Sequence, residues 1–200
     1  PAHADVPVAP FAARLEQALA RGESTLRLGS ADVDRLLARP GIAQTGDDSV
    51  IHDAIVAWLS GQERDHGCLL LEADAGWTPW TRRCLRQADR VLIVARAGDD
   101  PAPGPLESAL QAAGEHARRE LVLIHDDATA MPTGTAAWLA ARDLAAHHHV
   151  RLGSERDVGR LARRVSGLAT GSTVVLYEGS PFAPDRDVLW RMAERERITH

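Results

Sequence analysis

The sequence of 200 residues contains no lysine and no asparagine, so all 23 of its basic residues are arginines. An enzyme that forms a Schiff base needs a reactive lysine, and a Walker-type phosphate loop uses a lysine to reach the nucleotide phosphates. The composition therefore excludes both kinds of site, together with any role that depends on an asparagine side chain. Frequent alanine, 11 prolines and arginine in place of lysine are typical of coding by GC-rich DNA.

Long apolar runs and excess positive charge are also missing. No stretch approaches the roughly 20 apolar residues of a transmembrane helix. The net charge of -5 argues against a general nucleic-acid binder, which needs a basic surface. The two cysteines, Cys68 and Cys84, have neither metal-ligand spacing nor the pattern of a disulfide framework, and we expect buried thiols in a reducing compartment.

The remaining composition is that of an ordinary globular chain, with 44% hydrophobic and 26% charged residues, and the length suits about one domain. The chain begins at Pro1, and its methionines are Met131 and Met192. We therefore expect a processed product or a piece of a longer protein. The localisation we expect is cytoplasmic.

Apolar runs alternate with amphipathic segments along the whole chain. Runs of the kind found in strands covered on both faces lie at 68–74, 90–97 and 120–127, and one more strand is predicted at 172–179. A short alternating strand is predicted at 24–29, and a more polar strand, nearer a sheet edge, at 147–153. Helices are predicted at 10–22, 30–41, 47–67, 77–89, 106–118, 133–145, 154–167 and 185–197. This alternation predicts an α/β fold: a three-layer, mainly parallel, Rossmann-like sheet of five or six strands with helices on both faces.

The predicted helix after residue 77 carries the best candidate surface for a partner. Trp77 and Trp80 would pack the start of this helix onto neighbouring elements or onto another domain. Three arginines follow on the same helix, and Trp138 lies on a later one. Arginines on a solvated face are the alternative. The interface candidates are Trp77, Trp80, Arg82, Arg83, Arg86 and Trp138.

Two further groups of residues suggest metal chemistry. On a strand, His147 and His149 would share a face and could supply two ligands, but no cysteine or carboxylate pattern completes a four-ligand site, so they are weak candidates and we expect no metal. Asp74 ends a buried strand, where α/β proteins place magnesium or substrate. We favour a capping role for Asp74, because no phosphate loop accompanies it.

Catalytic residues are harder to find. His125 and Asp126 are adjacent in sequence, but a triad is a spatial arrangement, and there is no G-x-S-x-G motif. Ser180 lies at a strand-to-helix turn, yet Pro181 removes the backbone N–H that an oxyanion hole would use there. We therefore expect this chain alone to have no catalytic residue and no cofactor.

Several segments together resemble a known family: residues 65–107 with their tryptophans and arginines, then RRELVLIHDD, PTGTAAWLAAR and HHHVRLGSERDVGRLARRVSG. They are similar to one module of bacterial patatin-like phospholipases, the large relatives of neuropathy target esterase. In that family an α/β module lies between a cyclic-nucleotide-binding-like domain and the patatin hydrolase domain. The resemblance covers roughly residues 5–170. It implies a linker or regulatory module whose partners are neighbouring domains, or a second copy, with peripheral membrane contact only through the larger protein.

The resemblance fails at the end of the chain. In the family, a strand leads into a glycine-rich turn, G-G-G-x-R-G, whose N–H groups form the oxyanion hole. Here the segment STVVLYEGSP keeps the strand, but only Gly179 fits the turn. We therefore divide the chain into a Rossmann-like module, 1–167, and a final strand–helix unit, 168–200, that resembles a degenerate start of a patatin domain. No catalytic residue can be transferred from the family.

Two alternatives to a non-catalytic module remain open. The chain could be part of a serine esterase or lysophospholipase whose catalytic residues lie elsewhere. It could also be a degenerate nucleotide-binding switch, because CLLLEAD and QADRVLIVARAG resemble strands of the deviant phosphate-loop ATPases. That second resemblance implies a first strand upstream of Pro1, and it lacks the glycines and lysine of a phosphate loop.

Overall fold

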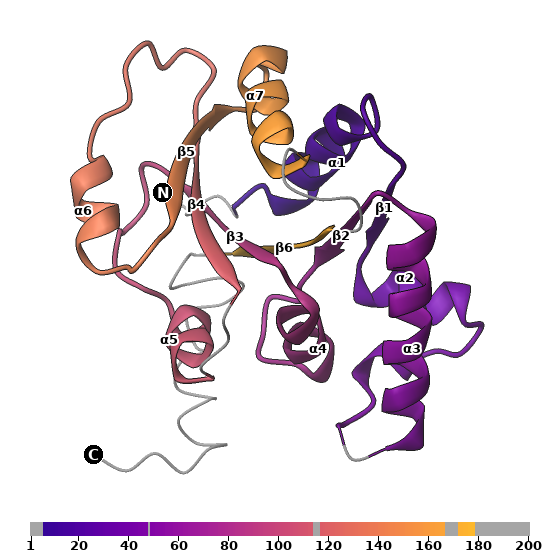
Figure 1. The fold of residues 1–200 in the computed structure, drawn as a ribbon. Coiled ribbons are helices and arrows are strands. Elements are labelled where there is room, and N and C mark those ends of the chain that lie inside the picture. Colours follow the sequence, from indigo (N-terminus) through magenta and orange to yellow (C-terminus); the bar gives the residue numbers. More distant parts are fainter. Residues whose placement is uncertain (1–5, 48, 114–116, 167–171, 179–200) are drawn as a thin grey trace, which may run out of the picture.

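The computed structural model of the chain describes residues 6–47, 49–113, 117–166 and 172–178. These residues form one sheet of six parallel strands surrounded by helices (Figure 1). The strands are β1 (Thr25–Leu28), β2 (Cys68–Glu72), β3 (Arg90–Arg96), β4 (Arg118–His125), β5 (Ala146–Arg151) and β6 (Ser172–Glu178). The helices are α1 (Val8–Leu19), α2 (Ser30–Leu36), η1 (Ile42–Gln44), α3 (Val50–Asp65), α4 (Pro79–Gln87), α5 (Pro105–Ala112), α6 (Thr135–Ala140) and α7 (Glu155–Ser166).

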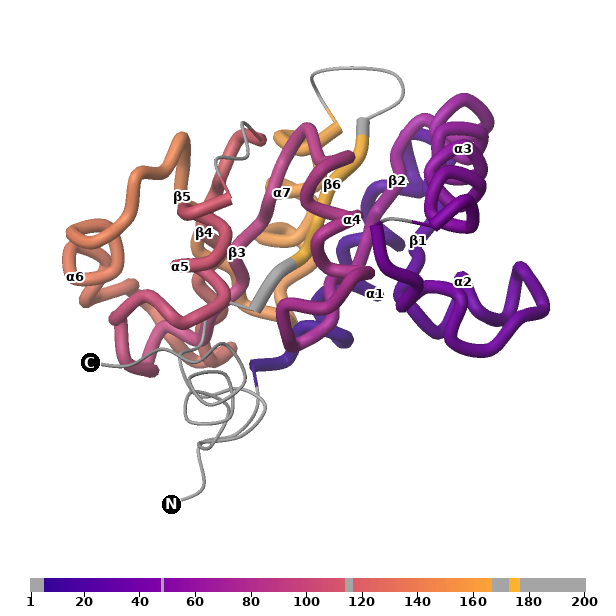
Figure 2. The backbone as a smooth tube through the Cα atoms, turned by 90° about the horizontal axis from the view of Figure 1, so that it is seen from below, coloured from indigo at the N-terminus to yellow at the C-terminus, as the bar shows by residue number. Residues whose placement is uncertain are grey.

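The sheet order is β1-β2-β6-β3-β4-β5, so the last strand in sequence lies near the centre (Figure 2). β6 pairs in parallel with β2 on one side and with β3 on the other. Every step from β1 to β5 crosses the sheet in one direction, whereas α7 returns from the edge strand β5 to the centre. Because parallel crossovers are right-handed, the return must cross the opposite face. This topology explains why α7 lies apart from α2 to α6.

The two faces of the sheet carry separate apolar layers, because successive strand residues point to opposite sides. One layer packs Leu69, Leu71 and Ile93 against α2 to α6, and the other packs Leu70 and Val94 against α1 and α7. Figure 1 shows α1 and α7 together above the sheet and α4 and α5 below it. The predicted three-layer α/β architecture is confirmed, and the sheet is entirely parallel.

The predicted elements in the described part of the chain are confirmed, but three helices end clearly earlier than predicted. The helices predicted to run to Arg118 and Ala145 end at Ala112 and Ala140, and Arg118 instead begins β4. The helix predicted to run to Gly41 ends at Leu36. Ala38 has a positive φ of 51°, which breaks the helical path. The Asp34 carboxylate then accepts hydrogen bonds from the backbone N–H groups of Gly41 and Ala43, at 2.6 and 2.9 Å. This local capping stabilises a turn where the sequence predicted continued helix.

Two further predictions are confirmed. The polar strand β5 forms the sheet edge beyond β4. Cys68 and Cys84 are both buried free thiols. No helix in the described part of the chain has the length and apolar character needed to cross a bilayer.

The predicted division near residue 167 stays a prediction. Residues 167–171 and the predicted helix at 185–197 lie outside the described residues. Ser172–Glu178 itself pairs within the same sheet as the preceding strands.

Candidate functional site

The carboxyl ends of the strands are where α/β folds place their ligands, and Asp74 follows β2 at this edge. Its carboxylate accepts three hydrogen bonds, from Ser30 Oγ at 2.7 Å, Gln44 Nε2 at 2.8 Å and Thr78 Oγ1 at 2.7 Å. These donors come from α2, η1 and the start of α4. Asp74 therefore joins three neighbouring segments of this edge.

We expected Asp74 to cap the following turn or helix, but the N-cap of α4 is Thr78, so Asp74 is not the cap of this helix. Thr78 Oγ1 accepts a hydrogen bond from the backbone N–H of Thr81 at 3.1 Å, and Pro79 occupies the first helical turn. A hydroxyl can accept and donate at once, so Thr78 also donates to Asp74. Asp74 positions the capping residue and does not cap the helix itself.

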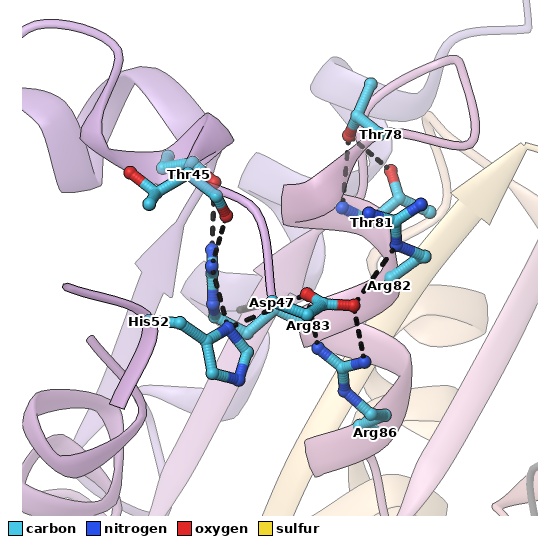
Figure 3. A network of polar contacts seen from close by, with 9 residues as sticks. Thr45, Asp47, His52, Thr78, Thr81, Arg82, Arg83 and Arg86 are labelled. Carbon is cyan, nitrogen blue, oxygen red and sulfur yellow. Dashed lines mark hydrogen bonds and ion pairs between the residues drawn. The ribbon is translucent and has the colours of Figure 1, made fainter. Parts of the chain in front are cut away.

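Arg83 fixes α4 onto the segment before α3 (Figure 3). Its guanidinium is fully buried and donates to the carbonyl oxygens of Ala43 and Thr45, at 2.8 and 2.9 Å. It also lies 3.1 Å from His52 Nδ1. Because arginine can only donate, this contact places the proton of a neutral His52 ring on Nε2. Burial lowers the pKa of Arg83, since it disfavours the charged form.

Asp47 binds the exposed side of the same helix (Figure 3). Its two carboxylate oxygens accept from Arg86 at 2.9 and 3.0 Å, and Arg82 Nε lies 3.6 Å away. The hydrogen bond from Arg86, together with the positive charges of Arg86 and Arg82, lowers the pKa of Asp47 to about 2. Asp47 is therefore ionised at neutral pH and neutralises part of the positive charge of α4.

The six predicted interface residues are divided between the core and the surface. Trp80, Arg83 and Trp138 are buried inside the chain, so a partner could not contact them directly. Trp80 Nε1 donates to the carbonyl oxygen of Glu72 at 2.8 Å, which ties α4 to the end of β2. The other three, Trp77, Arg82 and Arg86, keep exposed area around the start and the outer face of α4.

His147 and His149 share a face of β5, with ring centroids 5.5 Å apart. His149 Nδ1 lies 2.8 Å from Nε2 of His125, which ends β4. His148 points to the other face, where Nε2 contacts the buried carboxylate of Glu120 at 2.8 Å. Within the described residues, no group of three or more histidine, cysteine or carboxylate side chains could hold a metal ion.

The remaining candidates give no catalytic arrangement. Asp127 Oδ1 accepts from the backbone N–H of Gly153 at 2.7 Å, which joins the loops after β4 and β5. Gly179, Ser180 and Pro181 lie outside the described residues. The polar groups described at this edge join helices and loops to one another.

A family model for the "Neuropathy Target Esterase family P-loop like domain" matches residues 1–178. The chain belongs to this family. The module is 40% identical to human "Patatin-like phospholipase domain-containing protein 6" over 201 aligned positions, which cover 90% of the chain. It is 36% identical to mouse "Patatin-like phospholipase domain-containing protein 7" over 148 positions and 40% identical to "Lysophospholipase NTE1" of Cryptococcus neoformans over 151, each alignment covering 74% of the chain. No solved structure matches.

The chain spans between 9% and 14% of the length of these relatives. Their names therefore describe proteins of which this module corresponds to a small part.

Sequence reasoning missed Asp47 and His52 as partners of α4. Asp47 precedes α3 and His52 lies in the first turn of α3, so both are distant from α4 in the sequence. Thirty-nine positions separate Asp47 from Arg86. The available signal was the crowding of Arg82, Arg83 and Arg86 on one short helix, because so many positive charges need compensation when any of them is buried.

Proposed function

We propose that this chain is a non-catalytic linker or regulatory module of a patatin-like phospholipase, and that it acts by contact with neighbouring domains. The observation that carries the proposal is that the carboxylates of Glu72, which ends β2, and of Asp74, two residues later, are both hydrogen-bonded. Asp74 is bonded to Ser30, Gln44 and Thr78, and Glu72 accepts from Arg27 at 2.7 Å. These contacts use the groups with which an α/β enzyme would hold magnesium or substrate.

The end of the chain supports the same proposal. By the resemblance described above, the segment STVVLYEGSP would correspond to the first patatin strand and glycine-rich turn, of which it keeps one glycine. Backbone N–H groups form the oxyanion hole of such a turn, and Pro181 has none. We propose that this segment is a degenerate start of a patatin domain.

We also propose, from the arginine-rich and alanine-rich composition, that the chain is encoded by a bacterial, GC-rich genome.

Trp77, Arg82 and Arg86 are the proposed contact residues for the neighbouring domain. Aromatic and arginine side chains are enriched at the energetic centres of interfaces, and here they lie around one short helix held rigid from inside by Arg83. A rigid surface loses less conformational entropy on binding than a flexible one. A second copy of the chain is the alternative partner, and membrane contact would arise through the larger protein.

An esterase remains the alternative for the larger protein, because relatives of this module are named as phospholipases and a lysophospholipase. Its nucleophile would lie outside this chain. A nucleotide-binding switch is the second alternative, which the family description "P-loop like" favours. Against it, the chain has no lysine, and its first glycine is Gly22, beyond α1. A melting temperature that does not respond to Mg-ATP or Mg-GTP would exclude the switch.

The test compares the patatin-like hydrolase domain of the same phospholipase with and without this module fused to it. We expect the module to change the melting temperature or the KM of the hydrolase. Trp77→Ala should weaken that effect, whereas Arg39→Ala, at an exposed arginine in the turn after α2, should not. Identical hydrolases with and without the module would refute a linker or regulatory role.

A further inference from the structure

Arg96, at the carboxyl end of β3, differs from the other arginines that the structure describes as buried or half-buried. Arg27, Arg90, Arg142 and Arg151 each bond to a carboxylate at 2.6 to 2.8 Å. Arg82 and Arg83 lie in the network around Asp47 and His52, and Arg119 also has a partner. Buried Nε atoms without a hydrogen-bond partner occur in Arg82, Arg83 and Arg96. Arg82 lies near the Asp47 carboxylate and Arg83 bonds through its other nitrogens, whereas no described contact pairs the half-buried Arg96 guanidinium.

An unpaired guanidinium that has lost part of its water is unfavourable, because the lost hydration is not replaced by protein hydrogen bonds. The apolar layers of the core are formed by Val91 to Ala95 of β3, and Arg96 follows them at the strand end without a partner in the core. A guanidinium that lowers the stability of the free chain and makes no contact within the core is a candidate for binding a ligand.

Arg96 lines a pocket of about 250 Å³ over the ends of β3 and β4. A hydrogen bond from Ala97 N to Ile124 O at 2.9 Å continues the pairing of β3 and β4 beside this pocket. The polar side chains around it belong to Arg96, His125, Asp126, Thr129 and Thr133. It lies over the carboxyl ends of the paired parallel strands β3 and β4, the edge at which open α/β sheets bind their ligands.

The charges around the pocket limit the ligand. Arg96 supplies one positive charge and Asp126 one negative charge. Burial lowers the pKa of His125, so the imidazole is neutral at pH 7. A polyanion such as a nucleoside triphosphate would find no net positive field here. A single oxyanion suits a guanidinium, which can donate two parallel hydrogen bonds to it, with threonine hydroxyls as additional donors.

We propose that this pocket binds one phosphate-type oxyanion carrying a single negative charge, held by Arg96 and by the hydroxyls of Thr129 and Thr133. The oxyanion is either the monoanion of free phosphate or the phosphodiester of a lipid headgroup, since both present unesterified phosphate oxygens with one negative charge. This site is independent of the proposed linker function and lies away from α4, so each proposal can fail without the other.

The test follows the Arg96 Nε–H signal in ¹⁵N NMR spectra of the 200-residue chain, identified by its loss in Arg96→Gln. Inorganic phosphate and glycerophosphocholine are titrated separately at constant ionic strength, with chloride as the reference anion. We expect the Arg96 and Gly98 signals to shift with a Kd on the order of 1 mM, a common strength for so small a ligand. In Arg96→Gln the affinity should fall at least tenfold, and in Arg39→Gln it should not change. A response to phosphate alone indicates a free anion, and a response to glycerophosphocholine indicates a headgroup. No shift with either probe would overturn the proposal.

A second measurement separates a binding role from a structural one. Because Arg96 is unpaired in the free chain, Arg96→Gln should leave the melting temperature without ligand unchanged or raise it. Arg142→Gln, at a paired arginine, should lower it. A fall for Arg96→Gln as large as that for Arg142→Gln would overturn the proposal, since it would show that the fold itself uses Arg96.

Discussion

Asp47 and Arg86 form a bidentate ion pair across 39 positions of sequence, with oxygen–nitrogen distances of 2.9 and 3.0 Å. The pair joins the segment before α3 to the outer face of α4. Arg83 joins the same two regions from inside through Ala43 and Thr45. The arginine-rich helix is therefore held on two sides.

Asp47→Asn should lower the free energy of unfolding by about 1 kcal/mol at pH 7, because a partly exposed ion pair contributes little more than this. The folded-state pKa of Asp47, about 2, lies below its ordinary value of 3.8. Its stabilisation is therefore complete above about pH 4 and is lost as pH falls toward 2. Urea unfolding of both proteins across this range checks the prediction. A stability difference that stayed constant down to pH 2 would contradict it.

Arg142→Ala should be far more costly, about 3–5 kcal/mol, because it leaves the buried carboxylate of Glu107 without a partner. Arg142 bonds both oxygens of Glu107, at 2.7 and 2.8 Å, and also the carbonyl oxygen of Trp138. A double-mutant cycle with Glu107→Leu and Arg142→Met measures the coupling by chemical denaturation. The double variant should lose less stability than the sum of the losses in Glu107→Leu and Arg142→Met. Additive losses would refute the pairing.

Both cysteines should resist thiol reagents in the native chain. Burial raises the pKa of Cys68 to about 12 and the pKa of Cys84 well above its ordinary value, so neither forms the reactive thiolate at pH 8. A colorimetric disulfide reagent, which releases its own coloured thiolate when it reacts with a protein thiol, should not react with the folded protein. After unfolding in guanidinium it should release two equivalents of coloured thiolate per chain. Fast reaction of either thiol in the native chain would contradict the described packing.

Gly153→Ala should destabilise the chain by about 1 kcal/mol through loss of one hydrogen bond. A Cβ at this position would lie 2.2 Å from Asp127 Oδ2, so the carboxylate that now bonds Gly153 N must move away. Asp127→Ala removes the same bond and serves as the matched control. The double variant should lose no more than either single variant, as measured by thermal unfolding. A neutral Gly153→Ala would show that this contact does not hold the two loops.

The strands could be predicted from the sequence because burial on both faces requires continuous apolar residues. The polar residues 147–149 also predicted that β5 lies at a sheet edge, and the strand order confirms this. The central place of β6 could not be predicted, since an apolar run indicates burial and not which strands lie beside it. Pairing of β6 with β2 and β3 depends on the return of α7 across the second face.

The site was less predictable than the fold. A helical pattern places Arg82, Arg83 and Arg86 on one short helix, but it does not show that Arg83 is buried while Arg86 is exposed. That difference depends on Ala43, Thr45 and Asp47, which lie about 40 positions earlier. The capping role assigned to Asp74 failed for a related reason. Carboxylate and hydroxyl are both good caps, and the geometry of the turn selects Thr78.

The central claim is that this chain contributes contacts and no catalysis to a phospholipase. The most direct measurement is fatty-acid release from lysophosphatidylcholine by the purified 200-residue chain. The account predicts a rate equal to that of buffer at every protein concentration. Hydrolysis that increases in proportion to protein concentration at an enzyme-like rate would contradict it.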